Sequence, residues 1–539
     1  MSAKRLLSKD LLARGYLPRE LPRSFRSTTF ALASGSLTES LIPQKDWTET
    51  AALNLDRPGN LRRRLGIPNP FSLRALSTIC EREWTSLESH LGGSSVSMTT
   101  PRVGDASGRA LVFRRPFAAW AVERSLRAGT ARFCLKTDIS QCYGSLYTHS
   151  LEWALHSRAA SKANLKARGP ALIGGLLDRA VQAGQSGQTK GVPIGPDTSL
   201  LLAELVLTSI DVEMQAKVPH LAQRGFRFID DFEYFASSRA EAEDVLLTWE
   251  TALAGYELNL NELKTRIVEG PTPPEPAWRT QLARFEFRTT SDRVLANDIR
   301  SYFSLAFQFT IDHPSESVMA YALGRLRPLA WTQATWDSAS PLILGAAVSE
   351  PSAIIFANQH FAKAVSLGFT LSNGPIEESL NGVVEHHARL EHGATVTWAL
   401  YMLLNLGLSL SSDIADLASG MRDNCSLLVL RDLIGRGRVA GSVPTMSGAI
   451  ARAEAPGVLA SSDWLLGYEF ARNGWASDAE VRKQPHWKEL LDLKVKFYAQ
   501  DEVDRTNPLT GGVLPPSTPD VAAEEAEVTE GPGAVLFYE

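Results

Sequence analysis

The stretch RFIDDFEYF, residues 227–235, places two adjacent carboxylates, Asp230 and Asp231, inside a run of aromatic and β-branched residues. Such runs are typical of β-strands, so the pattern predicts two strands joined by a tight turn that carries both aspartates. Burying two like charges at this turn would be costly unless cations compensate them, and a divalent metal ion is the simplest compensation. An exposed Asp-Asp turn without function is the alternative interpretation of the dipeptide by itself.

A third carboxylate lies upstream, at the end of another predicted strand. In RFCLKTDISQCYGSLYTHS, residues 132–150, Asp138 closes the apolar run and Tyr143 follows it. A carboxylate at a strand end is well placed to join the Asp230 and Asp231 pair around two metal ions. Two Mg²⁺ ions about 3.5–4 Å apart can activate a 3′-hydroxyl and stabilise a leaving pyrophosphate. The sequence therefore predicts the chemistry of nucleotidyl transfer.

These stretches resemble the palm motifs of reverse transcriptases. FIDDF is similar to the [YF]xDD motif of that family. DISQCY is similar to its DxxxxY/F motif, in which an aromatic residue follows an aspartate by five positions. Between them, GVPIGPDTSLLLAE (191–204) resembles the Gly-rich segment under the templating base and incoming nucleotide. Beyond them, LNLNELKTRI (258–267) resembles the motif whose lysine approaches the leaving phosphates. Each of these four motifs is weak evidence by itself. The resemblance is specific because all four occur in the same order as in the family.

The resemblance implies roles for the matching residues. The catalytic residues would be Asp138, Asp230, Asp231 and Lys264. The three aspartates and the carbonyl of Ile139 would hold two Mg²⁺ ions, with Mn²⁺ as the alternative ion. Lys264 would act as general acid or charge stabiliser for the pyrophosphate, and Tyr143 would be a steric gate against a 2′-hydroxyl.

Further residues would bind the nucleotide and the nucleic acid. Arg109 would grip the triphosphate, with Arg114 and Arg115 as rivals. The remaining nucleotide-binding residues would be Gly191, Pro193, Gly195 and Ser199, of which the glycines let the backbone approach the base pair. Contacts with a nucleic-acid backbone would come from Arg62, Arg63 and Arg64.

The charge of the chain is unevenly distributed. Residues 1–132 contain 21 Lys and Arg but 11 Asp and Glu, whereas the remaining residues contain 34 and 49. A basic front is typical of a protein that holds phosphates, and a solvated basic surface is the alternative. The chain lacks an apolar run long enough to cross a membrane and pairs none of its four cysteines in a CxxC motif, so we expect a cytoplasmic protein without a membrane partner.

The predicted fold class is α+β, with right-hand-like polymerase fingers and palm followed by an all-α, repeat-like C-terminal domain. Strand patterns are concentrated before residue 270, and amphipathic helical patterns follow one another after about residue 300. The predicted segments are an N-terminal arm with short helices (1–55), basic fingers with a hairpin (56–132), the palm (133–270), a Pro-rich linker (271–300), the α-helical domain (301–512) and an acidic, disordered tail (513–539).

A narrower resemblance extends over nearly the whole chain. NLRRRLGIPNP, SLYTHSLEWALHS, GVPIGPDTS, GYLPRELPRSF and SDWLLGYEFARNGW are similar to the abortive-infection (AbiK-like) group of bacterial defence reverse transcriptases. This resemblance implies antiviral defence, a homo-oligomer, and template-independent DNA synthesis from dNTPs that is primed on a protein hydroxyl, with the DNA product covalently attached.

Several alternatives stay open at this point. Ile194 replaces the Gln that templated enzymes carry in the Gly-rich motif, which fits weaker template dependence. Tyr16, Tyr468 and Tyr498 are all candidates for the priming hydroxyl. A conventional RNA-templated reverse transcriptase that works with a noncoding RNA is one rival function. A non-catalytic nucleic-acid scaffold is another, although the intact aspartates and Lys264 argue against it.

Overall fold

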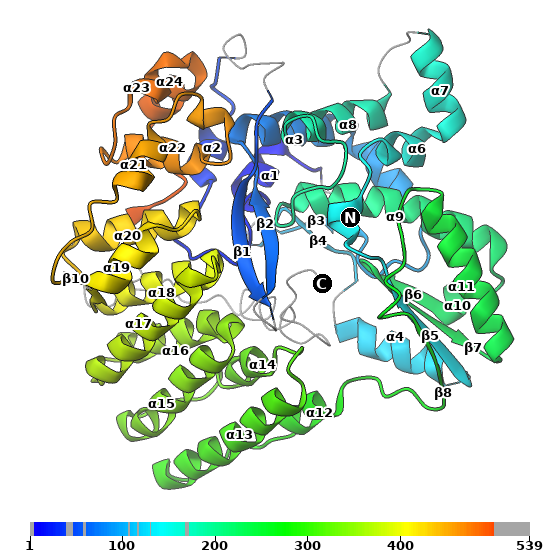
Figure 1. The fold of residues 1–539 in the computed structure, drawn as a ribbon. Helices are drawn as coiled ribbons and strands as arrows, with labels where there is room; N and C mark the ends of the chain where they lie inside the picture. The colour runs from blue at the N-terminus through cyan, green and yellow to red at the C-terminus, as the bar shows by residue number, and fades with distance from the viewer. Residues whose placement is uncertain are drawn as a thin grey trace.

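The structure, a computed structural model, describes residues 5–38, 47–57, 61–105, 108–115, 118–129, 131–167 and 172–500. The mixed α/β part lies at the centre and right of Figure 1, and the C-terminal helices form an arc at the left. The predicted α+β class, with a helical domain after the palm, is confirmed. The acidic tail expected at residues 513–539 lies outside the described residues.

The palm is built on a four-stranded antiparallel sheet with the strand order β6-β7-β5-β8. Its strands are β5 (Phe133–Asp138), β6 (Gly225–Phe228), β7 (Asp231–Ala236) and β8 (Arg266–Glu269). The strands β6 and β7 flank the predicted tight turn. The ladder between β5 and β7 sets Asp138 directly opposite Asp231, so the register of the sheet brings two of the three predicted metal ligands together.

Helices cover the two faces of this sheet unequally. Helix α11 (Arg239–Ala254) packs on β5 and β7, where the ring of Trp249 stacks on Phe232 at 4.5 Å between centroids. Helix α9 (Asp197–Lys217) lies beside α11 and is buried along most of its length, which explains its nearly continuous apolar sequence. On the other face, α4 (Ala118–Ala128) contacts β6 through Trp120 and leaves the strand ends beside the aspartates open.

The remaining elements of the first half support these helices. The helices are α3 (Pro70–Leu91), α5 (Cys142–Ser145), α6 (Ser150–His156), α7 (Arg158–Ala167), α8 (Ile173–Ala183) and α10 (Leu221–Arg224). Two hairpins precede the palm, formed by β1 (Ala51–Arg57) with β2 (Leu61–Ile67), and by β3 (Pro101–Val103) with β4 (Leu111–Phe113). The second hairpin lies within the region 56–132, in which the sequence predicts one.

The C-terminal domain consists of two layers of stacked helices (Figure 1). One layer contains α13 (Asp292–Asp312), α15 (Gln333–Ser349), α17 (Asn373–Arg389) and α19 (Ser412–Ser419). The other layer contains α14 (Val318–Arg325), α16 (Ile354–Ser366), α18 (Gly393–Leu406), α20 (Asn424–Gly435) and α22 (Trp464–Arg472). Each helix packs on the next one in its layer, as in repeat proteins, and the second layer contacts strand β1 through α18 and α20.

Short elements complete the helical domain. They are the 3₁₀ turns Pro351–Ala353 and Val458–Ala460, the strands β9 (Leu410–Ser411) and β10 (Val439–Ala440), and the helices α12 (Ala277–Ala283), α21 (Ser447–Ala453), α23 (Ala479–Lys483) and α24 (Pro485–Asp492). Helix α12 and the start of α13 occupy much of the segment 271–300 that the sequence predicts as a linker.

The N-terminal segment is part of the core. Its two short helices are α1 (Ser8–Arg14) and α2 (Thr28–Ala33). The rings of Phe30 and Phe497 lie 5.6 Å apart, and Arg26 N–H donates to the Phe497 carbonyl at 2.9 Å. Residues 26–30 therefore pack against the segment that follows helix α24.

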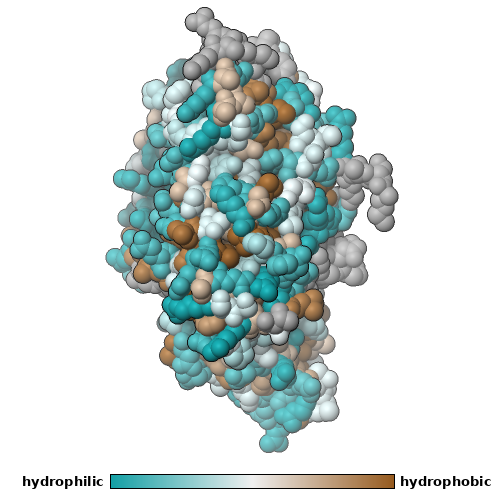
Figure 2. Space-filling model, turned by 90° about the vertical axis from the view of Figure 1, so that its right-hand side faces the viewer, coloured by the Kyte–Doolittle hydropathy of each residue, from teal (hydrophilic) through white to brown (hydrophobic). Residues whose placement is uncertain are grey.

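The surface facing the viewer in Figure 2, on the palm side, is largely hydrophilic, with hydrophobic residues in small groups. None of the helices in the described ranges is both long and apolar enough to cross a lipid bilayer.

Candidate active site

The three predicted aspartates converge at one edge of the palm sheet. Asp138, Asp230 and Asp231 each offer a carboxylate oxygen, and these oxygens lie within 4.8 Å of one another. Asp138 ends β5, Asp231 begins β7, and Asp230 lies in the turn between β6 and β7. The Ile139 N–H donates to the Asp230 carbonyl at 3.1 Å, so the backbone after Asp138 is fixed against the turn.

The turn before the aspartates has an unusual backbone conformation. Ile229 adopts φ of 52°, in the left-handed region that β-branched residues rarely occupy. Such a conformation costs roughly 1–3 kcal/mol and persists where the surroundings enforce it. Here the Ile229 N–H donates to Thr99 Oγ1 at 3.1 Å, and its carbonyl accepts from Arg227 Nη1 at 2.8 Å. Both backbone groups of the strained residue are therefore held by buried side chains.

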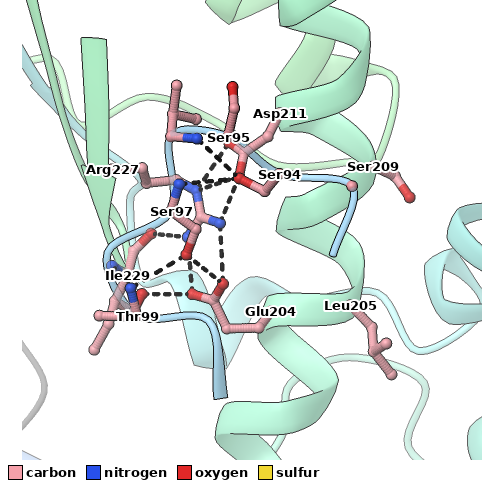
Figure 3. Close-up of polar contacts among 12 residues, drawn as sticks. Ser94, Ser95, Ser97, Thr99, Glu204, Leu205, Ser209, Asp211, Arg227 and Ile229 are labelled. Atoms are coloured by element: carbon pink, nitrogen blue, oxygen red, sulfur yellow. Dashed lines mark hydrogen bonds and ion pairs between the residues drawn. The ribbon is translucent and has the colours of Figure 1, made fainter. Parts of the chain in front are cut away.

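Arg227 anchors this turn to helix α9 through a buried ion-pair network (Figure 3). Its guanidinium is fully buried and pairs with Glu204 at 2.9 Å and with Asp211 at 2.7 Å. Glu204 and Asp211 lie two helical turns apart on the same face of α9, so one guanidinium reaches both carboxylates. The hydroxyls of Ser97 and Thr99 also donate to Glu204, at 2.9 and 2.7 Å. This network was not predicted from the sequence, although charged residues inside apolar runs are its signal.

The electrostatics of the aspartate group favour a bound cation. Burial, followed by the neighbouring carboxylates of Asp231 and Asp138, raises the pKa of Asp230 well above its ordinary value, although Lys264 opposes this shift. Lys264 Nζ lies 3.0 Å from Asp138 Oδ2. Asn261, which the sequence analysis also missed, donates from Nδ2 to Asp138 Oδ1 at 3.0 Å and holds that carboxylate in place. These oxygen donors suit Mg²⁺ or Mn²⁺, and the concentrated negative charge fits a site for such ions.

A cavity of about 700 Å³ opens above the aspartates. Besides palm residues, its walls include Arg57 and Leu61 of the first hairpin, and Ser315 and Glu316 of the helical domain. The volume lies within the range of ligand pockets and is sufficient for a nucleotide. Residues of the helical domain and of the hairpin therefore line the same cavity as the three carboxylates.

Cationic side chains line this cavity, and sequence reasoning did not single them out. They are Arg57, Arg124, Lys136 and Arg266. Lys136 could have been found, because it precedes Asp138 by two positions and so lies on the same face of β5. Glu233 orients two of these residues, since Arg124 Nε lies 2.8 Å and Lys136 Nζ 3.2 Å from its carboxylate.

The residues expected to bind the nucleotide lie elsewhere. Tyr143 is buried, and Arg109 pairs with Asp197 at 2.6 Å and donates to the Gly195 carbonyl at 2.9 Å. Neither residue is among the described residues that line the 700 Å³ cavity. Arg109 therefore holds the Gly-rich segment against the fingers in this conformation.

The Gly-rich segment itself packs against protein atoms. Gly191 has φ of +88° and Gly195 has φ of +128°, so both positions favour glycine. A Cβ atom on Gly191 would lie 3.1 Å from the Gly144 carbonyl oxygen, and one on Gly195 would lie 2.8 Å from Pro18. Pro193 and Ser199 line a separate cavity of about 30 Å³.

The arginine cluster divides between the two faces of strand β2. Arg62 and Arg64 are exposed, whereas Arg63, on the opposite face, lines a second cavity beside Glu20. This separation follows from the alternation of side chains along a strand. Arg62 and Arg64 remain available to solvent on the hairpin.

The three candidate priming tyrosines are buried. Tyr16 donates to the Pro68 carbonyl at 2.5 Å, Tyr468 to the Val495 carbonyl at 2.8 Å, and Tyr498 to Asp432 at 2.8 Å. Their hydroxyls are engaged in the core, and none of the three lines the cavity above the aspartates in the described part of the chain. None of them is positioned for priming in this conformation.

Comparison with known proteins agrees with the chemistry of this site. Residues 43–294 match the family described as reverse transcriptase (RNA-dependent DNA polymerase). No curated protein matches the chain. The chain is similar to the solved structure of apo telomerase from Candida tropicalis, truncated from its C-terminal domain, with 13% identity and a TM-score of 0.28, over 45% of this chain and 54% of the telomerase. The chain thus spans about half of the length of that telomerase.

We expect Arg227→Lys to lower kcat by about 10–100-fold with little change in the KM for dNTPs, because one ammonium cannot bridge Glu204, Asp211 and the Ile229 carbonyl together. Steady-state polymerisation with circular dichroism as a folding check measures this effect. Arg239→Lys, at an exposed position of α11, is the matched control. A folded Arg227→Lys protein with wild-type kcat would contradict the positioning role.

The raised pKa of Asp230 predicts a pH-dependent requirement for metal. Because the carboxylate must be ionised to bind a cation, protons compete with Mg²⁺ as the pH falls through this raised pKa. The Mg²⁺ concentration for half-maximal activity should therefore rise as the pH is lowered through the raised pKa of Asp230, by up to about tenfold per pH unit below it. A half-saturating Mg²⁺ concentration that stays constant over the whole pH range in which the protein remains folded would show that Asp230 is not a titrating ligand.

Proposed function

We propose that this chain, whose residues 43–294 match the reverse transcriptase family, is a DNA polymerase that joins dNTPs without a template. In this proposal it belongs to the abortive-infection (AbiK-like) group and acts in antiviral defence as a cytoplasmic homo-oligomer. Its DNA product begins on a protein hydroxyl and stays covalently attached. The observation that supports untemplated synthesis is the position of strand β2.

Strand β2 lies on the Gly-rich segment where the reverse transcriptase resemblance places the templating base. Leu65 of β2 forms a parallel bridge with Ile194, and the Gly66 N–H donates to the Ile194 carbonyl at 2.9 Å. A Cβ atom on Gly66 would lie 2.6 Å from Pro193, so the two backbones are in close contact. A templating base could reach this segment only if the hairpin moved.

The helical domain holds the hairpin in this position. Thr395 Oγ1 donates to Asp56 at 3.1 Å, Asn54 Nδ2 donates to the Glu391 carbonyl at 3.2 Å, and Trp464 Nε1 donates to the Ile67 carbonyl at 3.1 Å. The hydrogen bonds reach both strands of the hairpin. A helical domain in the place of a thumb would thus keep the template position covered.

Residues of the cavity would carry out the chemical step, and exposed residues of the hairpin would bind the DNA strand. Asp138, Asp230 and Asp231 would hold two Mg²⁺ ions, which when bound activate the attacking hydroxyl and neutralise the leaving pyrophosphate. Lys264 lies beside Asp138 and would place its ammonium group near the departing phosphates. The exposed Arg62 and Arg64 would contact phosphates of the growing strand.

The cavity also contains a candidate for the priming hydroxyl. Of the described residues that line it, Ser315 and Thr137 carry an aliphatic hydroxyl. Thr137 Oγ1 is hydrogen-bonded to Thr265 Oγ1 at 2.8 Å within the sheet. Ser315 lies in the loop between α13 and α14, on the opposite wall from the sheet, and is the better candidate.

We expect purified protein with Mg²⁺ and dNTPs to make DNA without added primer or template, and added RNA or DNA oligonucleotides to leave the base composition of the product unchanged. Asp230→Asn should lower synthesis by about 10³-fold or more, because a catalytic metal ligand is lost. Gel analysis and sequencing of the product measure both effects. Synthesis that starts only on addition of RNA would establish the rival function, an RNA-templated reverse transcriptase.

Ser315→Ala should abolish the covalent attachment of DNA to the protein but preserve extension of an added DNA primer. The reason is that the substitution removes the attacking oxygen and leaves the aspartates unchanged. Protease-sensitive gel mobility and mass spectrometry of nuclease-treated peptides measure the attachment. Ser317→Ala is the matched control, since Ser317 lies in the same loop but is not among the described residues that line the cavity above the aspartates. A nucleotide adduct mapped to a different residue would contradict this assignment.

A further inference from the structure

A second cavity, of about 280 Å³, lies between the hairpin formed by β1 and β2 and the helical domain. Its charged lining residues are Glu20, Asp56, Glu316, Glu350, Arg57 and Arg63. Four carboxylates face two guanidinium groups, so the fully ionised lining carries two excess negative charges. The cavity is therefore suited to a ligand with two positive charges.

Glu20 gives independent support for a ligand in this cavity. The residue is 2% exposed, and its Oε2 atom has no hydrogen-bond partner among the described residues. Burial raises the pKa of Glu20, although its backbone N–H and the guanidinium groups of Arg19, Arg109 and Arg63 oppose the shift. A buried carboxylate oxygen without a donor is rare in folded proteins and is usually satisfied by a ligand or water. A cationic donor in the cavity would supply the missing hydrogen bond.

Two other carboxylates of the cavity are also partly desolvated. Burial raises the pKa of Glu350 to about 7, even though its carboxylate accepts from the Met319 N–H at 2.7 Å and from Ser352 Oγ at 2.6 Å. Burial likewise raises the pKa of Asp56, which accepts from Thr395. Nearby positive charge would favour the ionised form of all three groups.

The form of the cavity favours an organic cation over a metal ion. In the part of the chain that the structure describes, the catalytic aspartates are the only group of three or more carboxylates close enough together to share one ion. The wall of the second cavity also includes apolar residues, among them Leu55, Ile354 and Trp398. Such walls accommodate methylene groups, and the indole of Trp398 can also attract an ammonium group.

We propose that this cavity binds a small linear alkyl diamine between the carboxylates of Glu20 and Glu350. The methylene chain of the diamine lies against Trp398 and Ile354. Arg57, Ser315 and Glu316 line this cavity and also the cavity above the catalytic aspartates. The bound diamine therefore braces the wall that the two cavities share. The proposal does not depend on the polymerase activity.

The test is a calorimetric titration of the full chain with 1,4-diaminobutane at constant ionic strength, without nucleotides or Mg²⁺. Wild-type protein should bind one diamine, and Glu20→Gln should weaken binding at least tenfold. The matched control is Glu378→Gln, on the exposed face of α17, which should bind as the wild type does. Butylamine, with a single ammonium group, should bind at least tenfold more weakly than the diamine.

A second variant keeps the test decisive if Glu20→Gln does not fold. Glu350→Gln removes the other proposed anchor, and it should lose the increase in melting temperature that diaminobutane gives the wild-type protein. Equal diamine affinity of the wild-type and Glu20→Gln proteins would overturn the proposal, as would equal binding of butylamine. Since no nucleotide is present, neither result would bear on the proposed polymerase function.

Discussion

The buried guanidinium of Arg227 is the constraint on which the catalytic edge of the palm depends. It joins the turn before the aspartates to Glu204 and Asp211 of α9, and it accounts for the left-handed conformation of Ile229. Buried ion pairs of this kind contribute little net stability, because desolvation of the charges offsets their attraction. The role of this network is geometric. The planar guanidinium of Arg227 donates in fixed directions and so determines how the carboxylates of Asp230 and Asp231, which follow Ile229, are oriented.

The hairpin formed by β1 and β2 is the second organising element, because it contacts both halves of the chain. One strand lies on the Gly-rich segment of the palm, and the hairpin is hydrogen-bonded to the helical domain. The chain thus connects its catalytic part and its helical part through a small piece of sheet. Any movement of the helices that carries the hairpin along would uncover the Gly-rich segment.

Local patterns in the sequence were sufficient to predict the strands and the three aspartates, because the alternation of side chains and the ends of strands can be recognised from a stretch of about ten residues. The partners of Arg227 could not be found in this way, since α9 meets the turn only through the tertiary fold. The same reason applies to Arg109. Its place in the sequence suggested that it binds a phosphate, but in the folded protein it forms an ion pair with Asp197. The prolines of the segment 271–300 suggested a linker, yet helix α12 begins directly after Pro276, where a proline is compatible with a helix start.

The two-layer stack of the C-terminal domain has a mechanical consequence. Each helix packs mainly on its neighbours in the stack. Small rotations between successive helices therefore add up to a large bend of the whole stack. The end with α20 and α22 is connected to the N-terminal segment through residues 497–499, whereas the end with α13 joins the palm through the chain at residues 270–276. The greatest compliance is therefore expected near the loop of Ser315 and Glu316, so that elastic bending of the stack would change the width of the cavity.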